Sequence, residues 1–166
     1  ANLTSGLGQR VQESRTSLYE ALIGAVPLES VLLKTELSHL SLAPADRNLT
    51  GAEVELVTAS AREYRLKEAL APLRDQFDYI FIDCPPSLGL LTLNALVAAD
   101  AVLIPLHCEY FALEGLADLV ATMRRVRSAL NPGLDIEGVL LTMYDERTNF
   151  GQQVARDVVL HFLAMR

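Results

Sequence analysis

One carboxylate closes a short apolar run in the sequence. Residues 79–82 are four consecutive apolar residues, and Asp83 follows them directly. The run is too short for a helix and is rich in residues that favour β-structure, so it predicts a strand buried on both faces. Ligands of open parallel sheets bind at the carboxyl ends of the strands. A carboxylate at that edge suits Mg²⁺ held beside nucleotide phosphates.

A simpler interpretation of Asp83 also exists, because an aspartate after an apolar run can cap a helix or accept loop N–H groups. The two residues Pro85 and Pro86 favour the metal-binding interpretation. Proline fixes φ and has no N–H, so the chain leaves the strand as a stiff extended segment. Such a segment, residues 84–89, is suited to report whether a terminal phosphate is present.

Helical and strand patterns alternate along the chain. Capping-box spacing at Ser17 to Glu20 and at Thr50 to Glu53 predicts the starts of two helices. Helices are predicted over residues 17–25, 51–59, a stretch through Leu66, Leu70 and Leu73, 90–98, 113–130 and from Asn149 onward. Further strands are predicted over residues 39–44, 101–105 and 138–142. This alternation implies an α/β fold of three layers, α/β/α, in which helices cover both faces of a mostly parallel sheet.

The composition narrows the class of protein. The 166 residues are enough for one domain, and with 51% hydrophobic but only 6% aromatic residues the core must be mainly aliphatic. No apolar run reaches the roughly 18–20 residues of a membrane span, and residues 1–10 lack a signal-peptide pattern. Cys84 and Cys108 show neither a zinc nor a disulfide spacing, so we expect reduced thiols and a cytoplasmic protein.

Three arginines stand within four residues of the long predicted helix, at Arg124, Arg125 and Arg127. The net charge of −7 disfavours nucleic acid, so DNA binding would need a local basic patch of this kind. The simpler alternative is a solvated helix end whose positive charge favours the helix dipole. Both interpretations stay open at the level of sequence.

Residues 78–116, DYIFIDCPPSLGLLTLNALVAADAVLIPLHCEYFALEGL, resemble the central region of the ParA/Soj family. Its members are chromosome- and plasmid-partitioning ATPases, deviant-Walker P-loop proteins related to MinD. The likeness extends to LAPADRNLTGAEVEL (42–56), to GVLLTMYDERTNFGQQVARDV (138–158) and to ANLTSGLG (1–8), which is similar to the stretch after the family's Asp-Pro-Gln motif. The resemblance implies a P-loop NTPase-like fold, in which Asp83 ends the Walker B strand.

The resemblance also implies parts that residues 1–166 do not contain. The family's first strand, its glycine-rich Walker A loop with two lysines and its Asp-Pro-Gln aspartate would precede Ala1. We therefore expect the catalytic residues upstream of Ala1, and a single but incomplete ParA-type ATPase domain over residues 1–166. Because the backbone N–H cradle for phosphates belongs to that loop, we expect residues 1–166 alone to be inactive and to bind ATP poorly.

For the intact protein the resemblance implies an ATP hydrolase with ATP and Mg²⁺ as cofactors. ATP drives formation of a homodimer, the dimer binds DNA non-specifically, and a ParB/Spo0J-like protein stimulates hydrolysis. The implied location is the cytoplasm and the nucleoid, without membrane association. In this scheme Asp83 supports the Mg²⁺, and Pro85 and Pro86 belong to the segment that responds to the γ-phosphate.

The resemblance places the base pocket after the 138–142 strand, in Thr142, Met143, Tyr144 and Asp145. It places Asn2 and Thr4 near the phosphates. Ordinary loop roles stay open for all of these residues. Two other functions stay open as well: a MinD-like membrane-cycling ATPase, which needs a C-terminal amphipathic helix, and a non-catalytic interaction module without a P-loop. The sequence of residues 78–116 favours the ParA type.

Overall fold

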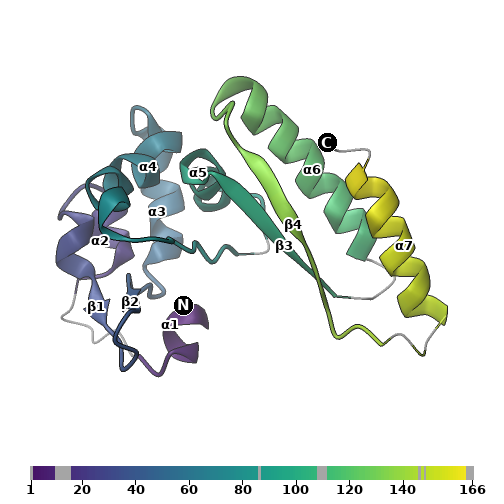
Figure 1. Ribbon diagram of the computed structural model, residues 1–166. Coiled ribbons are helices and arrows are strands. Elements are labelled where there is room, and N and C mark those ends of the chain that lie inside the picture. The colour runs from purple at the N-terminus through teal and green to yellow at the C-terminus, as the bar shows by residue number, and fades with distance from the viewer. Residues whose placement is uncertain are drawn as a thin grey trace. The chain divides into compact units, whose positions relative to one another are not determined.

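The structure is a computed structural model that describes residues 2–9, 16–85, 87–107, 112–145, 147 and 149–163. The chain divides into two compact units, Ala1–Ala98 and Ala99–Arg166 (Figure 1). Within the described ranges no helix combines the length and the apolar character needed to span a membrane.

The first unit is built from short helices and one small antiparallel ladder. Its α-helices are α1 (Asn2–Gly6), α2 (Leu18–Leu22), α3 (Leu49–Glu55), α4 (Arg65–Leu70) and α5 (Leu90–Ala98). Its 3₁₀ turns are η1 (Leu28–Val31), η2 (Leu56–Thr58), η3 (Arg62–Tyr64) and η4 (Ala71–Gln76). The strands β1 (Leu33–Lys34) and β2 (Ser41–Leu42) pair antiparallel, so only the centre of the predicted 39–44 strand forms a ladder.

Helix α2 shows why local sequence signals place its ends. The predicted capping box is confirmed: the Ser17 N–H donates to Glu20 Oε2 at 2.7 Å, and the Ser17 side chain accepts from the Tyr19 N–H. At the other end the Gly24 N–H donates to the Ala21 carbonyl at 3.2 Å, and the Ala25 N–H donates to the Glu20 carbonyl at 2.9 Å. This pair of bonds is a Schellman motif, which requires the left-handed φ of +81° at Gly24.

Tertiary contacts override the second predicted capping box. Helix α3 begins at Leu49, with Asn48 as its N-cap residue, and not after Thr50. The Glu53 carboxylate does not turn back to its own helix; it accepts the N–H of Leu91 in α5 at 3.3 Å. The apolar spacing predicted for the next helix is confirmed in α4 and η4, where Leu66 and Leu73 are buried.

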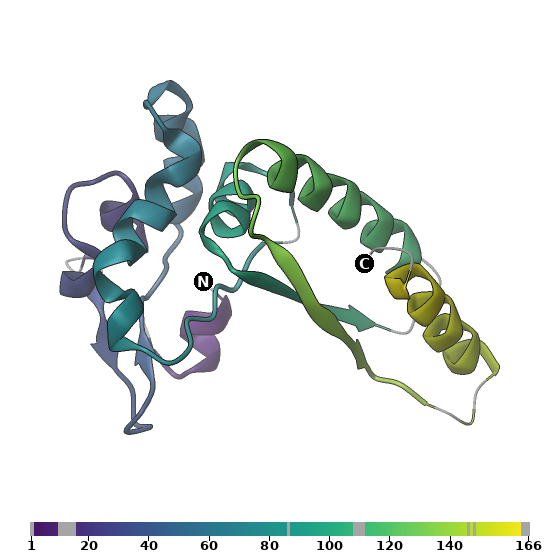
Figure 2. The ribbon, with the colours of Figure 1, turned by 45° about the horizontal axis from the view of Figure 1, so that its top comes forward.

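The second unit is a parallel strand pair with two helices. Strands β3 (Ala101–His107) and β4 (Asp135–Thr142) pair in parallel, as predicted, with an irregularity between Val102 and Leu103. Helices α6 (Ala112–Ala129) and α7 (Asn149–Leu163) lie beside the pair (Figure 2). The apolar core that joins these elements consists of Ile104, Leu106, Leu116, Val120, Val154 and Val158.

Within this unit the strands alternate between covered and exposed side chains. Ile104 and Leu106 face the two helices, whereas Leu103 on the opposite side of β3 is 50% exposed. Leu140 of β4 is similarly exposed, at 52%. The helices of this unit therefore cover one face of the pair, whereas the prediction was of strands buried on both faces.

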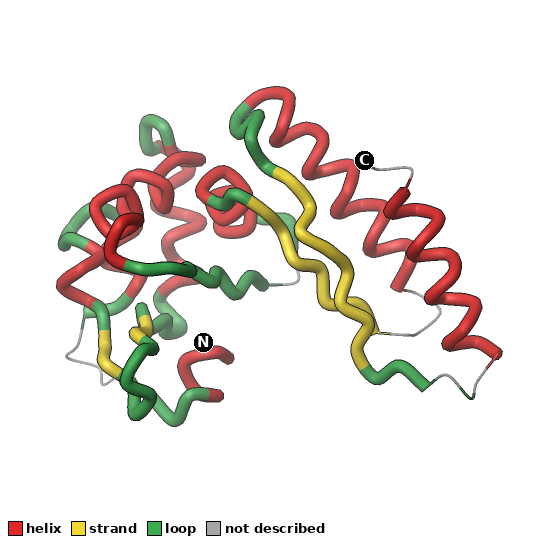
Figure 3. Tube along the Cα trace, in the orientation of Figure 1, coloured by secondary structure: helices red, strands yellow, loops and turns green. Residues whose placement is uncertain are grey.

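The predicted strand at residues 79–82 is wrong in the described structure. Residues 77–85 run without regular secondary structure, coloured as loop in Figure 3, and no strand pairs with them among the described residues. Tyr79 and Phe81 are each 81% exposed, and their rings stack with centroids 6.3 Å apart. The apolar pattern predicted burial, but a strand also needs a neighbour for its N–H and C=O groups.

We expect Gly24→Ala to lower the free energy of unfolding by about 1–2 kcal/mol, because alanine is disfavoured at positive φ. Gly51→Ala is the matched control. A Cβ would have nothing within 4 Å at either position, but Gly51 lies inside α3 without a positive φ. That control should raise the unfolding free energy by about 0.4–1 kcal/mol. Urea unfolding followed by circular dichroism measures both, and equal effects of the two substitutions would contradict the Schellman assignment.

Candidate functional site

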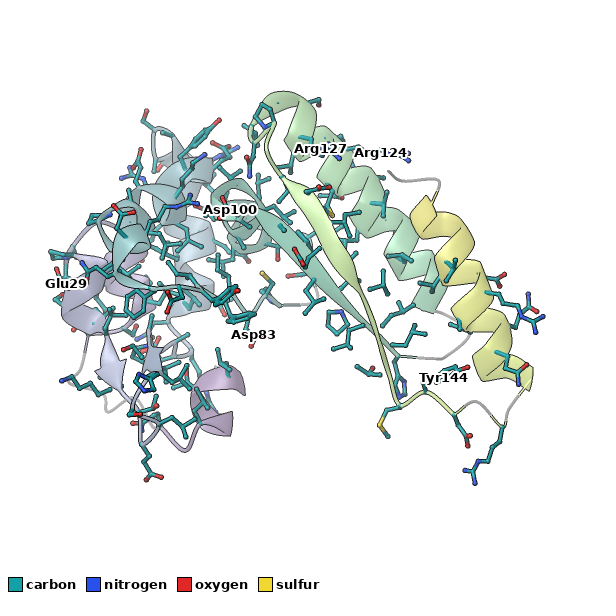
Figure 4. All side chains as sticks on the ribbon, viewed as in Figure 1. Glu29, Asp83, Asp100, Arg124, Arg127 and Tyr144 are labelled. Atoms are coloured by element: carbon teal, nitrogen blue, oxygen red, sulfur yellow. The ribbon has the colours of Figure 1, made fainter. Side chains whose placement is uncertain are left out.

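Asp83 lies on the extended segment 77–85 of the first unit and is exposed to solvent (Figure 4). The residue before it, Ile82, packs against the apolar cluster formed by Leu22, Leu66, Ala95 and Ala98. Because successive side chains of an extended chain point to opposite sides, anchoring Ile82 turns the next side chain away from the cluster. The segment therefore presents the Asp83 carboxylate to solvent.

Cys84 carries a thiol whose protonation depends on this carboxylate. The Cys84 Sγ lies 3.7 Å from the Ile82 carbonyl oxygen. Partial burial of the thiol, and then the negative charge of Asp83, raise the pKa of Cys84 above its ordinary value.

The end of the segment 84–89 is hydrogen-bonded to helix α5. Pro85 is exposed, and Pro86 lies outside the described residues. The Thr92 hydroxyl donates to the Ser87 carbonyl at 2.6 Å, and the Leu93 N–H donates to the Gly89 carbonyl at 3.0 Å. The end of the segment is therefore fixed by the first turn of α5.

Helix α5 is in turn held by Asn94, a residue that sequence reasoning did not single out. Asn94 is 1% exposed; its Oδ1 accepts the Leu66 N–H at 3.1 Å. Its Nδ2 donates to the carbonyls of Arg62 and Leu90 at 2.9 and 3.0 Å. The signal was an asparagine inside the apolar run of residues 90–98, since a buried amide there must find partners in a neighbouring element.

The four predicted base-pocket residues belong to the second unit and come one after another at the end of β4. Thr142 is the last residue of the strand and pairs in register with His107. Met143 has a left-handed φ of 54° and is 81% exposed, and Tyr144 is 42% exposed (Figure 4). A non-glycine residue at such a φ is strained by about 1–2 kcal/mol. This backbone conformation turns the chain sharply out of the strand.

Asp145 forms a two-point ion pair with Arg147 in the same loop. The Arg147 Nε and Nη2 lie 2.9 and 2.8 Å from the two carboxylate oxygens, and the Arg147 N–H also donates to Asp145 Oδ1 at 3.0 Å. These hydrogen bonds hold the pKa of Asp145 below its ordinary value and raise that of Arg147. The Asp145 carboxylate thus shapes the loop, and its charge is already paired.

The N-terminal candidates lie on α1. Asn2 begins that helix. Thr4 is 4% exposed, and its Oγ1 accepts the Ala45 N–H at 3.0 Å. This bond connects α1 to the residues before α3, which gives Thr4 a structural role.

Arg124, Arg125 and Arg127 are all exposed on α6, as the basic-patch interpretation requires. The same helix buries Val120, Met123 and Val126. Figure 4 labels Arg124 and Arg127, which are three residues apart and so lie on neighbouring positions of the helix surface. In the part of the chain that the structure describes, none of the three arginines forms an ion pair with a carboxylate.

The described residues fit a metal site that is completed by phosphate oxygens and water better than a site made of protein ligands alone. Among the described residues no group of three or more His, Cys, Asp and Glu side chains could enclose a metal ion. Mg²⁺ at nucleotide sites is usually held by one or two carboxylates together with phosphate oxygens and water. A single exposed carboxylate at Asp83 is consistent with that mode of binding.

Comparison with known families and proteins gives consistent matches. A family model described as an AAA domain matches residues 1–136. The chromosome partitioning protein ParA of Myxococcus xanthus is 55% identical over 161 residues, or 97% of this chain, and that of Caulobacter vibrioides is 51% identical over 163 residues. The sporulation initiation inhibitor protein Soj of Bacillus subtilis is 50% identical over 161 residues. The chain spans 57%, 61% and 64% of the lengths of these relatives.

Solved structures share the fold. A cobyrinic acid a,c-diamide synthase from Mycobacterium smegmatis, with bound ADP and magnesium, is 43% identical with a TM-score of 0.88 over 95% of this chain and 64% of that one. A Cyanothece McdA variant in complex with ATP is 26% identical, with a TM-score of 0.82 over 95% of this chain and 62% of that one. These matches confirm the predicted α/β class and its P-loop NTPase-like character.

We expect Asp83→Asn to lower the pKa of Cys84, because the substitution removes the negative charge that disfavours the thiolate. In a background with Cys108→Ser, alkylation of Cys84 by uncharged iodoacetamide at pH 7.5 should become about two- to fivefold faster, since only the thiolate reacts. Asp78→Asn changes the net charge equally and should leave the rate unaltered. A pH–rate profile that is identical with and without the Asp83 charge would contradict this coupling.

Proposed function

The chain belongs to the AAA-domain family that includes the ParA and Soj chromosome-partitioning proteins, and we propose that the intact protein is a partitioning ATPase. The observation that carries the proposal is a similarity that extends over nearly the whole chain and includes the segment around Asp83. Residues 1–166 contribute to a single ATPase domain in this proposal. The activity, its cofactors and its partners are all parts of the proposal.

In the proposed site Asp83 supports a Mg²⁺ ion beside the nucleotide phosphates. When bound, the metal neutralises charge on the phosphates and so favours phosphoryl transfer to water. The solvent-exposed carboxylate, one residue beyond the anchored Ile82, supports this role. Bound ADP and magnesium in a 43% identical solved structure support the same cofactors.

Residues 84–89 form the segment that responds to the γ-phosphate. Pro85 and Pro86 limit its conformations, while Thr92 holds its far end through the Ser87 carbonyl. A segment that is stiff and tied at one end moves as a unit, so a change at its free end reaches α5. Asn2 is proposed to lie near the same phosphates.

The base pocket of the proposal is the loop of Thr142, Met143, Tyr144 and Asp145. The turn at Met143 exposes two large side chains, and the half-exposed Tyr144 ring offers a flat surface to a purine. The Asp145–Arg147 pair holds the loop in place, so the contacts to the base come from Tyr144, Met143 and the loop backbone.

The proposed cellular function is the one that the resemblance implies. ATP drives formation of a homodimer, the dimer binds DNA non-specifically through Arg124, Arg125 and Arg127, and a ParB/Spo0J-like protein stimulates hydrolysis. These arginines are exposed and form no ion pair within the described residues, which supports the DNA contact, because phosphate binding needs cationic side chains that are not already neutralised. The protein then acts in the cytoplasm, associated with the nucleoid.

We expect Asp83→Asn in the intact protein to lower the turnover number for Mg²⁺-dependent ATP hydrolysis by about 100-fold or more, since the amide keeps the shape but loses the charge. Asp78→Asn, at the other end of the same apolar run, is the control and should hydrolyse ATP at the wild-type rate. Phosphate release measured with saturating ATP, DNA and Mg²⁺ tests both. Wild-type activity in the Asp83 variant would remove this residue from the site, and an inactive wild type would favour a non-catalytic interaction module.

We expect replacement of Arg124, Arg125 and Arg127 by alanine to weaken DNA binding of the ATP-bound protein equally for all sequences. The slope of log K against log salt should become less negative by about 2.7, since each lost phosphate contact contributes about 0.9. Fluorescence anisotropy of labelled duplexes over a series of salt concentrations measures the slope.

The control for this experiment replaces three exposed cations of the first unit, Arg47, Lys67 and Arg74, by alanine. This variant has the same net charge as the arginine-cluster variant. Equal losses in the two variants would show that only total charge matters, and would contradict a binding role for the cluster on α6.

A further inference from the structure

The first turn of α5 lacks a cap from its own sequence. Gly89 precedes the helix and has no side chain, so it cannot accept a hydrogen bond from the free N–H groups of the first turn. The Leu91 N–H instead donates to Glu53 Oε1, at 3.3 Å, from helix α3. A carboxylate is favoured at that position because the helix dipole places positive charge there.

Gly89 and Glu53 occupy complementary space. A Cβ at position 89 would lie 3.2 Å from Glu53 Cδ and would overlap Glu53 Oε1. Any larger residue at position 89 would therefore displace the carboxylate from the Leu91 N–H. Gly89, which has no side chain, leaves the space that the Glu53 carboxylate occupies. We call these two residues together the α3–α5 clamp.

The two glutamates near the end of α3 serve different partners. Glu55 Oε1 accepts the hydroxyl of Tyr19 at 2.6 Å and so connects α3 to α2. Glu53, two residues earlier, faces α5. Glu55 is thus a control on the same helix with the same charge and a different contact.

The clamp acts where the phosphate-responsive segment ends. Residues 84–89 lead directly into α5, and the Thr92 hydroxyl fixes Ser87 from the α5 side. The Glu53 carboxylate joins the first turn of α5 to a different helix, α3. A displacement of residues 84–89 that carries the first turn of α5 with it must therefore also move α3 or break the bond between Glu53 and Leu91.

We propose that Glu53 is a positioning residue that, through Gly89 and the first turn of α5, sets the place of residues 84–89 relative to α3. The inference rests on the proposed ATPase function and deepens it: Glu53 does not touch the nucleotide, but it fixes the segment that responds to the γ-phosphate. Glycine at position 89 leaves open the space that the Glu53 carboxylate fills.

The experiment is a double-mutant cycle in the intact protein, with Glu53→Ala, Gly89→Ala and both together. We expect each single substitution to lower kcat for ATP hydrolysis about tenfold and to change KM for ATP less than threefold, because the phosphate cradle is untouched. The double variant should be no slower than Glu53→Ala, since the added methyl group then meets no carboxylate. Glu53→Gln retains an oxygen acceptor and should recover at least half of the lost rate.

Glu55→Ala is the control and should keep the wild-type kcat. Urea unfolding of every variant runs in parallel, and the proposal requires the same non-additivity in stability, which is measurable without activity. A wild-type kcat in Glu53→Ala, or additive effects of the two alanines, would overturn the clamp and leave the proposed function intact. A wild-type protein that hydrolyses no ATP would overturn the proposed function, and with it the role of Glu53.

Discussion

The position of the candidate site depends on the burial of one amide, that of Asn94. Three hydrogen bonds leave it fully paired: two join α5 to the η3–α4 region, and the third returns to its own helix. An unpaired buried polar group costs about 1–3 kcal/mol, so any shift of α5 that breaks these bonds is strongly disfavoured. Helix α5 is therefore the fixed reference against which the preceding residues 84–89 are placed, with Glu53 and Thr92 holding its first turn.

The segment before α5 is positioned by different means. Residues 77–85 have no ladder partner among the described residues, so side chains and not backbone bonds hold them. Phe77 packs into the cluster around Leu28 and Leu73, and Ile82 packs into the cluster that includes Leu66. These two anchors bracket the exposed Tyr79 and Phe81. The chain is thus held at its two ends while the Asp83 carboxylate stays open to solvent.

The sequence predicts those features whose causes are local. The Ser17 capping box and the helix over residues 90–98 both depend on neighbours within a turn or two, and both are confirmed. The Thr50–Glu53 box failed because a distant N–H, that of Leu91, competes for the same carboxylate. The 79–82 strand failed for a related reason: apolar character describes what a segment tends to bury, whereas a ladder depends on which strand lies alongside. For the candidate site, the sequence suggested Asp83, which stays a prediction. The asparagine inside the apolar run of residues 90–98 indicated a buried amide, but the partners of Asn94 and Glu53 lie in other helices and could not be identified from the pattern.

The two acidic residues proposed to lie near the nucleotide, Asp83 and Asp145, differ in whether their charge is already paired. Asp145 accepts three hydrogen bonds from Arg147, which lower its pKa and use both of its oxygens. Bringing a metal to that carboxylate would mean breaking a two-point ion pair, and the loop that exposes Tyr144 would lose its support. Asp83 forms no ion pair within the described part of the chain. Partial burial, and then the negative charge of Asp83, raise the pKa of its neighbour Cys84. Charge pairing therefore favours Asp83 over Asp145 as the carboxylate that supports a metal in the proposed site, and it gives Asp145 the role of loop support.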